Sequence, residues 1–199
     1  PAASERQMTH LKALAEMVKA EAGILESDSA AEVETKLGRA VAATVDETEA
    51  EWVAGHLRPL VGLGEDGESR GDTRAEAFAA WRRFLEGLGD RGPAVLVFED
   101  LHWADDGLLD FVDHLVDRAV DVPLLVVGTA RPELLDRRQG WGGGKANATT
   151  ISLQPLGDDD TAHLISALLE RPVQLADEQK TLLERAGGNP LFAEQYVRM

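Results

Sequence analysis

Two adjacent carboxylates, Glu99 and Asp100, follow directly on the apolar run "AVLVF" of residues 94–98. A pair of carboxylates at the end of a buried strand is costly unless a cation or a water-filled cleft lies beside it. One carboxylate of such a pair can hold Mg²⁺, directly or through water, while its neighbour orients a water for attack on a phosphate. The residues alone leave a second interpretation open, in which the strand ends and polar residues begin an ordinary loop.

A second apolar run ends in a similar way. In "PLLVVGTARPEL", residues 123–134, Thr129 and Arg131 follow the apolar stretch. If the two runs form neighbouring parallel strands, these residues emerge at the same edge of the sheet as the acidic pair. An always-charged guanidinium can bind a terminal phosphate and respond to its loss. The alternative for Arg131 is an ion pair with a surface carboxylate.

A third segment, "ERAGGNPLFAEQYV" of residues 184–197, combines a glycine pair with a proline. Asn189 suits a helix N-cap and Pro190 the first turn of a helix, so the local structure explains these residues without a ligand. A functional interpretation is also open, because a rigid turn from Gly188 to Pro190 could approach the flat face of a base.

Two glycine-rich stretches resemble nucleotide loops, and neither fits. A phosphate loop reads G-x-x-x-x-G-K-[ST] and opens a helix. The stretch "GWGGGKANATT", residues 140–150, is preceded by Gln139 where the first glycine belongs, and Ala146 replaces the hydroxyl residue. Residues 62–67 match G-x-G-x-x-G, but they follow a helical pattern and contain acidic residues where a pyrophosphate would lie. Both are predicted to be surface loops.

The composition limits the possible partners. The chain has 199 residues, 44% of them hydrophobic, which is enough for a core. The 36 acidic residues outnumber the 20 basic ones, and the net charge of −16 disfavours direct binding of nucleic acid by this segment. There is no cysteine, no signal peptide and no apolar run long enough for a membrane span. We expect a soluble, cytoplasmic protein without membrane contact.

The elements that must position these residues follow from the hydrophobic pattern. Helical spacing dominates residues 1–90, with capping boxes at 29–32 and 73–76 and an apolar stripe from Phe78 to Leu88 that is typical of a core. The pattern then changes to an α/β arrangement. We expect parallel strands at 94–98, buried on both faces, and at 123–130, a weaker third strand at 149–153, and a helix between the first two strands.

The C-terminal region is helical again. Helices are predicted at 161–169, at 176–186 and from Pro190 onward. The composition shift near Pro155 predicts a boundary between a core of residues 1–156 and a small helical appendage of residues 157–199.

Three motifs together resemble a known family. "FEDLHWAD", "GTARPEL" and "GGNPLF" are similar to the Walker B, sensor 1 and Gly-x-Pro motifs of STAND-type P-loop ATPases, which are relatives of AAA+ proteins. The similarity is greatest to large bacterial regulators that carry this module beside a class III adenylate cyclase domain, or ahead of TPR-like repeats and a LuxR-type helix-turn-helix. It implies ATP and Mg²⁺ as cofactors, a partial P-loop NTPase core with an incomplete parallel sheet, and a helical lid at 157–199.

The resemblance also implies a role for individual residues. Glu99 and Asp100 would form the Walker B pair, and either can contact Mg²⁺, because many relatives have aspartate first. Arg131 would be the sensor 1 arginine near the γ-phosphate, and Thr129 would lie beside it. The turn with Gly188 and Pro190 would contact adenine and couple the nucleotide state to the lid. His102 and Trp103 belong to the signature without an assigned role, and Trp103 is expected to pack in the core.

The resemblance further implies that a phosphate loop, with its strand and helix, lies upstream of this segment in a longer polypeptide. The segment alone is then expected to hydrolyse little ATP, and its sheet to be gapped or completed by a strand from another chain. The favoured function is a nucleotide switch that controls an output domain, a cyclase or a DNA-binding module, with self-association possible. The alternative is a non-catalytic interaction module on a degenerate ATPase fold.

Overall fold

The computed structural model describes residues 11–64, 74–168 and 188–198. The chain divides into two compact units, Pro1–Thr149 and Thr150–Met199, and each is described by itself. Within the described residues, no helix combines the length and the apolar character that crossing a bilayer requires.

The N-terminal half of the first unit is helical, as predicted. Its elements in chain order are α2 (Lys12–Ala22), α3 (Ala30–Ala42), α4 (Glu47–Leu57), the 3-10 helix η1 (Arg58–Val61) and α5 (Arg74–Arg91). The predicted capping box of Ser29 and Glu32 is present, with the Glu32 N–H donating to the Ser29 side chain and the Ser29 N–H to the Glu32 carboxylate. The second predicted capping box, at residues 73–76, lies partly outside the described residues.

An aromatic cluster holds α5 against α6 (Asp106–Arg118). Phe78 and Trp81 of the predicted stripe are buried, and the ring of Phe111 lies 5.4 Å from that of Phe78 and 5.5 Å from that of Trp81. The indole N–H of Trp81 donates to the carbonyl oxygen of His56 at 2.9 Å, which ties α5 to α4. These side chains form the core on which the sheet rests.

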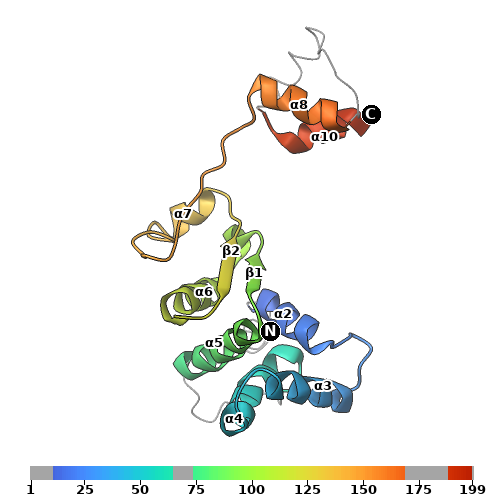
Figure 1. Ribbon diagram of the computed structural model, residues 1–199, viewed down its shortest axis with the longest axis vertical. Coiled ribbons are helices and arrows are strands. Elements are labelled where there is room, and N and C mark those ends of the chain that lie inside the picture. The colour runs from blue at the N-terminus through green and yellow to red at the C-terminus, as the bar shows by residue number, and fades with distance from the viewer. Residues whose placement is uncertain (1–10, 65–73, 169–187, 199) are drawn as a thin grey trace, which may run out of the picture. The chain divides into compact units, whose positions relative to one another are not determined.

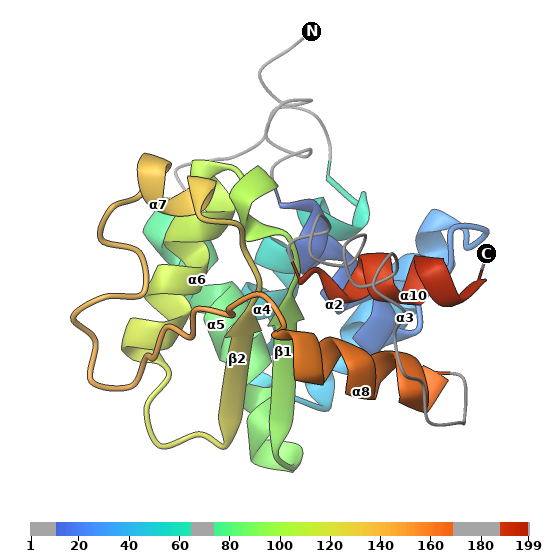
Figure 2. The same cartoon turned by 90° about the horizontal axis from the view of Figure 1, so that it is seen from above.

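The sheet of the described chain has two parallel strands, β1 (Ala94–Phe98) and β2 (Leu124–Gly128), in the register Ala94↔Leu124. The helix α6 connects them, which makes a β-α-β unit, the usual connection between parallel strands. Figures 1 and 2 show the strands side by side, with α5 and α6 along one side of the pair. The predicted parallel pairing of the two apolar runs is therefore confirmed.

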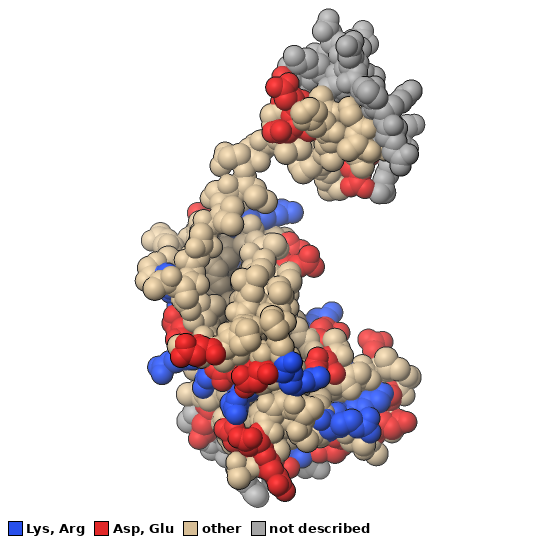
Figure 3. Space-filling model, viewed as in Figure 1, with Lys and Arg blue, Asp and Glu red and all other residues tan. Residues whose placement is uncertain are grey.

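The expectation that the first strand is buried on both faces is wrong. Leu96 and Phe98 are buried, but Val95 is 61% exposed, and Leu125, on the same face of the neighbouring strand, is 58% exposed. Figure 3 shows a mostly uncharged surface over the strands. The helices of the described chain cover only one face of the sheet. A continuously apolar run is typical of a strand in a sheet that is covered on both faces.

The predicted third strand at residues 149–153 is also absent: these residues have no ladder partner in the described structure. Leu153 is 91% exposed. β-branched residues favour a strand only where a neighbouring strand can pair with them, and here the pattern "TTISL" has no such neighbour.

The glycine-rich stretch of residues 140–150 forms turns and irregular structure, and no helix follows it directly. The ammonium group of Lys145 lies 2.6 Å from a carboxylate oxygen of Asp117 and 3.3 Å from one of Asp113, both on α6. This lysine holds the loop to α6. The prediction of a loop at this stretch is confirmed, and the interpretation that it is not a phosphate loop stays a prediction.

The second unit contains α8 (Asp158–Leu168) and α10 (Pro190–Arg198), while the helix predicted at 176–186 lies outside the described residues. Asn189 caps α10 as predicted, since its side-chain oxygen accepts from the Leu191 N–H at 3.0 Å. Gly188 has a φ of +68°, and a Cβ there would lie 2.3 Å from the carbonyl oxygen of Leu156. Its own carbonyl oxygen accepts from the Leu156 N–H at 2.9 Å, so a glycine is required for this close approach.

Candidate functional site

The loops that follow β1 and β2 are joined by hydrogen bonds. The Thr129 N–H donates to the carbonyl oxygen of Phe98 at 2.9 Å, and the Leu101 N–H donates to the carbonyl oxygen of Thr129 at 2.8 Å. The Thr129 hydroxyl oxygen accepts from the Asp100 N–H at 3.1 Å. The pairing thus continues past both strand ends, and Thr129 fixes the backbone of the acidic loop.

Asp100 has an unusual backbone conformation. Its φ of 55° and ψ of 39° lie in the left-handed region, which only aspartate, asparagine and glycine adopt at low cost. The side chain is 75% exposed, and Glu99 is exposed as well. Strained backbone of this kind is concentrated at functional sites, where it aims a side chain.

His102, two residues further on, is buried between the two loops. It belongs to the 3-10 helix η2 (Leu101–Trp103). Its Nδ1 atom lies 3.4 Å from the backbone nitrogen of Arg131, whose N–H donates to it, and 3.9 Å from a carboxylate oxygen of Asp100. One buried ring therefore stands next to both loops that carry the predicted chemistry.

Arg131 is exposed and differs from the arginines around it. Within the described residues, the hydrogen bond to His102 engages its backbone, and no ion pair engages its guanidinium. The interpretation of Arg131 as one half of a surface ion pair therefore has no counterpart in the described structure. The residue lines a hollow of about 330 Å³ together with His102, Trp103, Glu133 and Arg137.

Trp103 is not the core residue that was expected. Its side chain is 78% exposed at the edge of the hollow, and its ring centroid lies 5.1 Å from that of His102. Leu101 supplies the apolar side chain of η2 that is buried in the core. Trp103 lies two residues further along this short helix, so its side chain points elsewhere.

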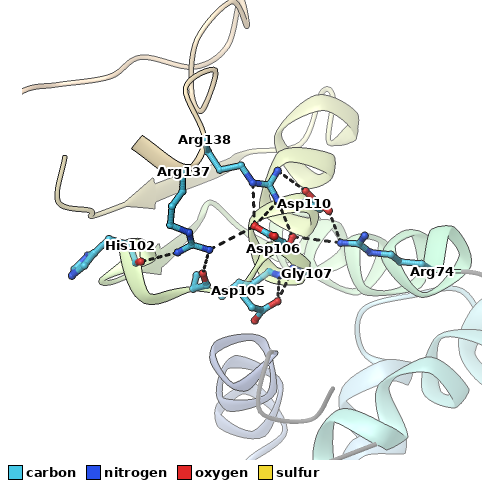
Figure 4. Close-up of polar contacts among 10 residues, drawn as sticks. Arg74, His102, Asp105, Asp106, Gly107, Asp110, Arg137 and Arg138 are labelled. Carbon is cyan, nitrogen blue, oxygen red and sulfur yellow. Dashed lines mark hydrogen bonds and ion pairs between the residues drawn. The ribbon is translucent and has the colours of Figure 1, made fainter. Parts of the chain in front are cut away.

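Two arginines hold the loop after β2 in place (Figure 4). They are Arg137, the last residue of the short helix α7 (Glu133–Arg137), and Arg138, which follows it. The Arg137 guanidinium donates to the carbonyl oxygens of His102 at 2.9 Å and Ala104 at 3.0 Å. The Arg138 guanidinium lies 3.0 Å from a carboxylate oxygen of Asp106 and 2.8 Å from one of Asp110. The segment after β2 is thereby fixed to η2 and α6.

Electrostatics strengthen this attachment. Burial raises the pKa of the Asp110 carboxyl, but hydrogen bonds from Arg138 and Arg74 outweigh it and hold the pKa below its usual range. The hydrogen bonds that Arg138 donates to Asp110 and Asp106 in turn raise the pKa of Arg138. Asp110 and Arg138 therefore remain ionised at neutral pH.

Glu99 and Asp100 suit a magnesium ion only if a bound nucleotide supplies further ligands. In the described part of the chain, no group of three or more His, Cys, Asp or Glu side chains could hold a metal ion. Magnesium bound with a nucleotide needs only one or two protein carboxylates, because phosphates and water complete its shell. The exposed side chains of Glu99 and Asp100 meet that requirement.

The structure brings Glu99, Asp100, Thr129 and Arg131 to one end of the first unit's sheet. Gly188 and Pro190 belong to the second unit, where the turn packs against Leu156 as described above. Sequence reasoning assigned no role to His102 and overlooked Arg137. The sequence does contain a signal for Arg137. The basic pair "RR" at 137–138 follows the second apolar run, and the acidic "ADD" of residues 104–106 follows the first, so the two segments have complementary charges.

Two comparisons with known proteins find a match to part of the chain. A family model described as "AAA ATPase domain" matches residues 3–127, a region that includes Glu99 and Asp100 and ends before Thr129. An uncharacterized protein of Rhizobium meliloti (strain 1021) is 36% identical over 128 residues, which are 61% of this chain and 12% of that protein. The chain thus spans a small part of the length of this relative. No solved structure matches the chain.

Proposed function

Because the chain belongs to the AAA ATPase domain family, we propose that it is part of an ATP-dependent switch. In this switch, the loops after β1 and β2 contact the Mg²⁺ and the terminal phosphate of a bound ATP. The nucleotide state then sets the activity of an output domain in a longer polypeptide.

The observation that carries the proposal is the joining of the two loops through Thr129. Its hydroxyl oxygen accepts from the Asp100 N–H at 3.1 Å, and its carbonyl oxygen accepts from the Leu101 N–H at 2.8 Å. These bonds keep the exposed acidic pair close to the segment that carries Arg131, whose guanidinium has no ion-pair partner within the described residues. Ligands of parallel α/β sheets bind at this edge, beyond the carboxyl ends of the strands.

Each residue has a role in the proposal. Glu99 or Asp100 would hold Mg²⁺, and the other would orient the attacking water. The bound Mg²⁺ would neutralise charge on the phosphates. Arg131 would contact the γ-phosphate, and Thr129 keeps the two loops in register. Gly188 and Pro190 would contact the adenine ring.

The proposal requires a phosphate loop, and the chain has no G-x-x-x-x-G-K-[ST] sequence. Another segment of a longer polypeptide would supply it. The open sheet face with Val95, Val97, Leu125 and Val127 supports this idea, because parallel sheets are covered on both faces in complete α/β domains. A strand and helix carrying the phosphate loop would extend the sheet and cover that face.

At a coarser scale, we propose that residues 157–199 act as a lid whose position depends on the nucleotide. The motifs further suggest a cytoplasmic STAND-type regulator with a cyclase or LuxR-type output domain and with self-association as part of its activation. The relative, of which the matched region is 12%, is long enough to carry such additional domains.

Thermal unfolding of the longer polypeptide, with and without Mg²⁺-ATP, tests the proposal. At a hundredfold excess of ligand over Kd, binding stabilises the folded state by about 2.7 kcal/mol. We expect the melting temperature to rise by several degrees, and the rise to require Mg²⁺. A polypeptide that contains the phosphate loop and shows no shift would instead support the interaction module.

A further inference from the structure

We propose that His102 is a positioning residue for Arg131: its Nδ1 atom anchors the backbone of the second loop and thereby sets where the guanidinium can reach. The effect on nucleotide chemistry rests on the proposed function, but the hydrogen bond that anchors the loop is a property of this chain. It assigns a role to a buried histidine that the chemistry above does not use.

The geometry places the imidazole between the loops. The side chain of His102 is 5% exposed, and its Nδ1 accepts from the Arg131 N–H at 3.4 Å. The nearest carboxylate oxygen of Asp100 is 3.9 Å from the same atom, beyond hydrogen-bond distance. Because Nδ1 accepts, the neutral ring carries its proton on Nε2.

The ring is held from several sides. The carbonyl oxygen of His102 accepts from Arg137 at 2.9 Å, and the indole of Trp103 lies against the imidazole at 5.1 Å between centroids. Its Nε2 is buried without a hydrogen-bond partner in the described structure.

The position of the Arg131 guanidinium depends on this anchor. No side-chain hydrogen bond or ion pair fixes it within the described residues, so its reach is set by the backbone from which it extends. A hydrogen bond that fixes the backbone at Arg131 therefore limits the volume that the guanidinium explores. Catalytic groups lose large rate factors when they are displaced by about 1 Å.

The first experiment uses this chain without nucleotide. Hydrogen exchange of the Arg131 amide is measured by NMR in wild type, H102A, H102N and H102Q. Asparagine can place its side-chain oxygen near the position of Nδ1, whereas glutamine mimics Nε2. We expect H102A and H102Q to speed the exchange about fivefold, as loss of one hydrogen bond allows, and H102N to remain near wild type.

Exchange of the core amides in α5 and α6 shows whether each variant is folded. If the Arg131 amide exchanges equally in all folded variants, or if glutamine rescues as well as asparagine, the anchor through Nδ1 is wrong. The comparison of H102N with H102Q stays informative even if H102A does not fold.

The second experiment uses the longer polypeptide with its phosphate loop and measures the ratio of ATP to ADP affinity. H102A should reduce the ratio in the same direction as R131A, and the double variant should show no more loss than R131A alone, since both act through one group. Additive losses would overturn the positioning role. If R131A itself leaves the ratio unchanged, the proposed function fails, while the amide exchange still decides whether His102 anchors the loop.

Discussion

At the scale of single residues, the arginines near the site divide by their partners. Arg137 and Arg138 contact carbonyl oxygens and the carboxylates of Asp106 and Asp110, whereas the guanidinium of Arg131 has no hydrogen-bond or ion-pair partner among the described residues. In a chain with 36 acidic residues, an arginine without a carboxylate is informative. Arg137 and Arg138 therefore hold the loop in place, whereas the guanidinium of Arg131 is available to bind a ligand.

The backbone of Asp100 gives a prediction in which stability and function oppose each other. Its left-handed φ of 55° costs an aspartate more than a glycine, which has no Cβ. Asp100→Gly should therefore raise the free energy of unfolding by up to about 1 kcal/mol, while it weakens Mg²⁺-dependent nucleotide binding in the longer polypeptide. Urea unfolding measures the first effect. Glu99→Gly is the control, and a loss of stability in Asp100→Gly as large as in this control would contradict the strain.

At the scale of elements, α5 touches the end of α3 without space for a side chain. A Cβ on Gly87 would lie 1.9 Å from the carbonyl oxygen of Thr44. Gly87→Ala should destabilise the chain by about 2–3 kcal/mol, because the backbones must separate. Gly38→Ala in α3 meets nothing within 4 Å and should stabilise it by about 0.5–1 kcal/mol. Chemical denaturation of both variants checks this, and equal signs would show that the contact is not as described.

The packing of α6 on α5 also predicts a pH dependence. Burial, together with Arg82 and Arg118, lowers the pKa of His114, whose ring lies 5.6 Å from that of Phe78. Below the unfolded value of about 6.5 the unfolded state then binds more protons than the folded state, so stability falls as the pH falls through this window. His114→Gln should remove that part of the slope between pH 7 and 5. An unchanged slope in unfolding curves across this range would contradict the assignment.

At the scale of the whole molecule, the proposed cover of the open sheet face predicts different effects of one substitution in this chain and in a longer polypeptide that contains the phosphate loop. Val97 is exposed here, so Val97→Lys should change the chain's own stability by less than about 1 kcal/mol. In the longer polypeptide the same lysine would be buried and should cost several kcal/mol. Thermal unfolding of both forms measures the difference. Val120→Lys is the matched control, because Val120 is exposed in the loop between α6 and β2 and is not part of a strand. Similar effects of Val97→Lys in both forms would argue against a covered face.

Sequence reasoning was strongest where local chemistry decides the structure. The Ser29 capping box, the buried stripe of α5 and the parallel pairing of two apolar runs are all present, because each depends on neighbours close in sequence or on simple burial. It failed where the structure depends on pairing or packing partners that the described residues do not supply. The pattern at 149–153 resembles a strand but has nothing to pair with in the described residues, and the outer face of β1 has no cover there.

The candidate site shows the same division. Adjacent acids and an arginine after apolar runs are visible in the sequence, so Glu99, Asp100 and Arg131 could be selected from it. The role of His102 could not, because it depends on a 3.4 Å contact between loops 29 positions apart. The exposed position of Trp103 was likewise hidden, since an aromatic residue next to an apolar run usually packs in the core.

The most direct test of the central claim is calorimetric titration of the longer polypeptide with Mg²⁺-ATP and Mg²⁺-ADP, in wild type, Arg131→Ala and the control Arg39→Ala. A charge-assisted contact with the γ-phosphate is worth about 1.5–3 kcal/mol. We therefore expect wild type and Arg39→Ala to prefer ATP, and Arg131→Ala to lose about tenfold or more of that preference. If Arg131→Ala weakens both nucleotides equally, or neither, then Arg131 does not face the terminal phosphate.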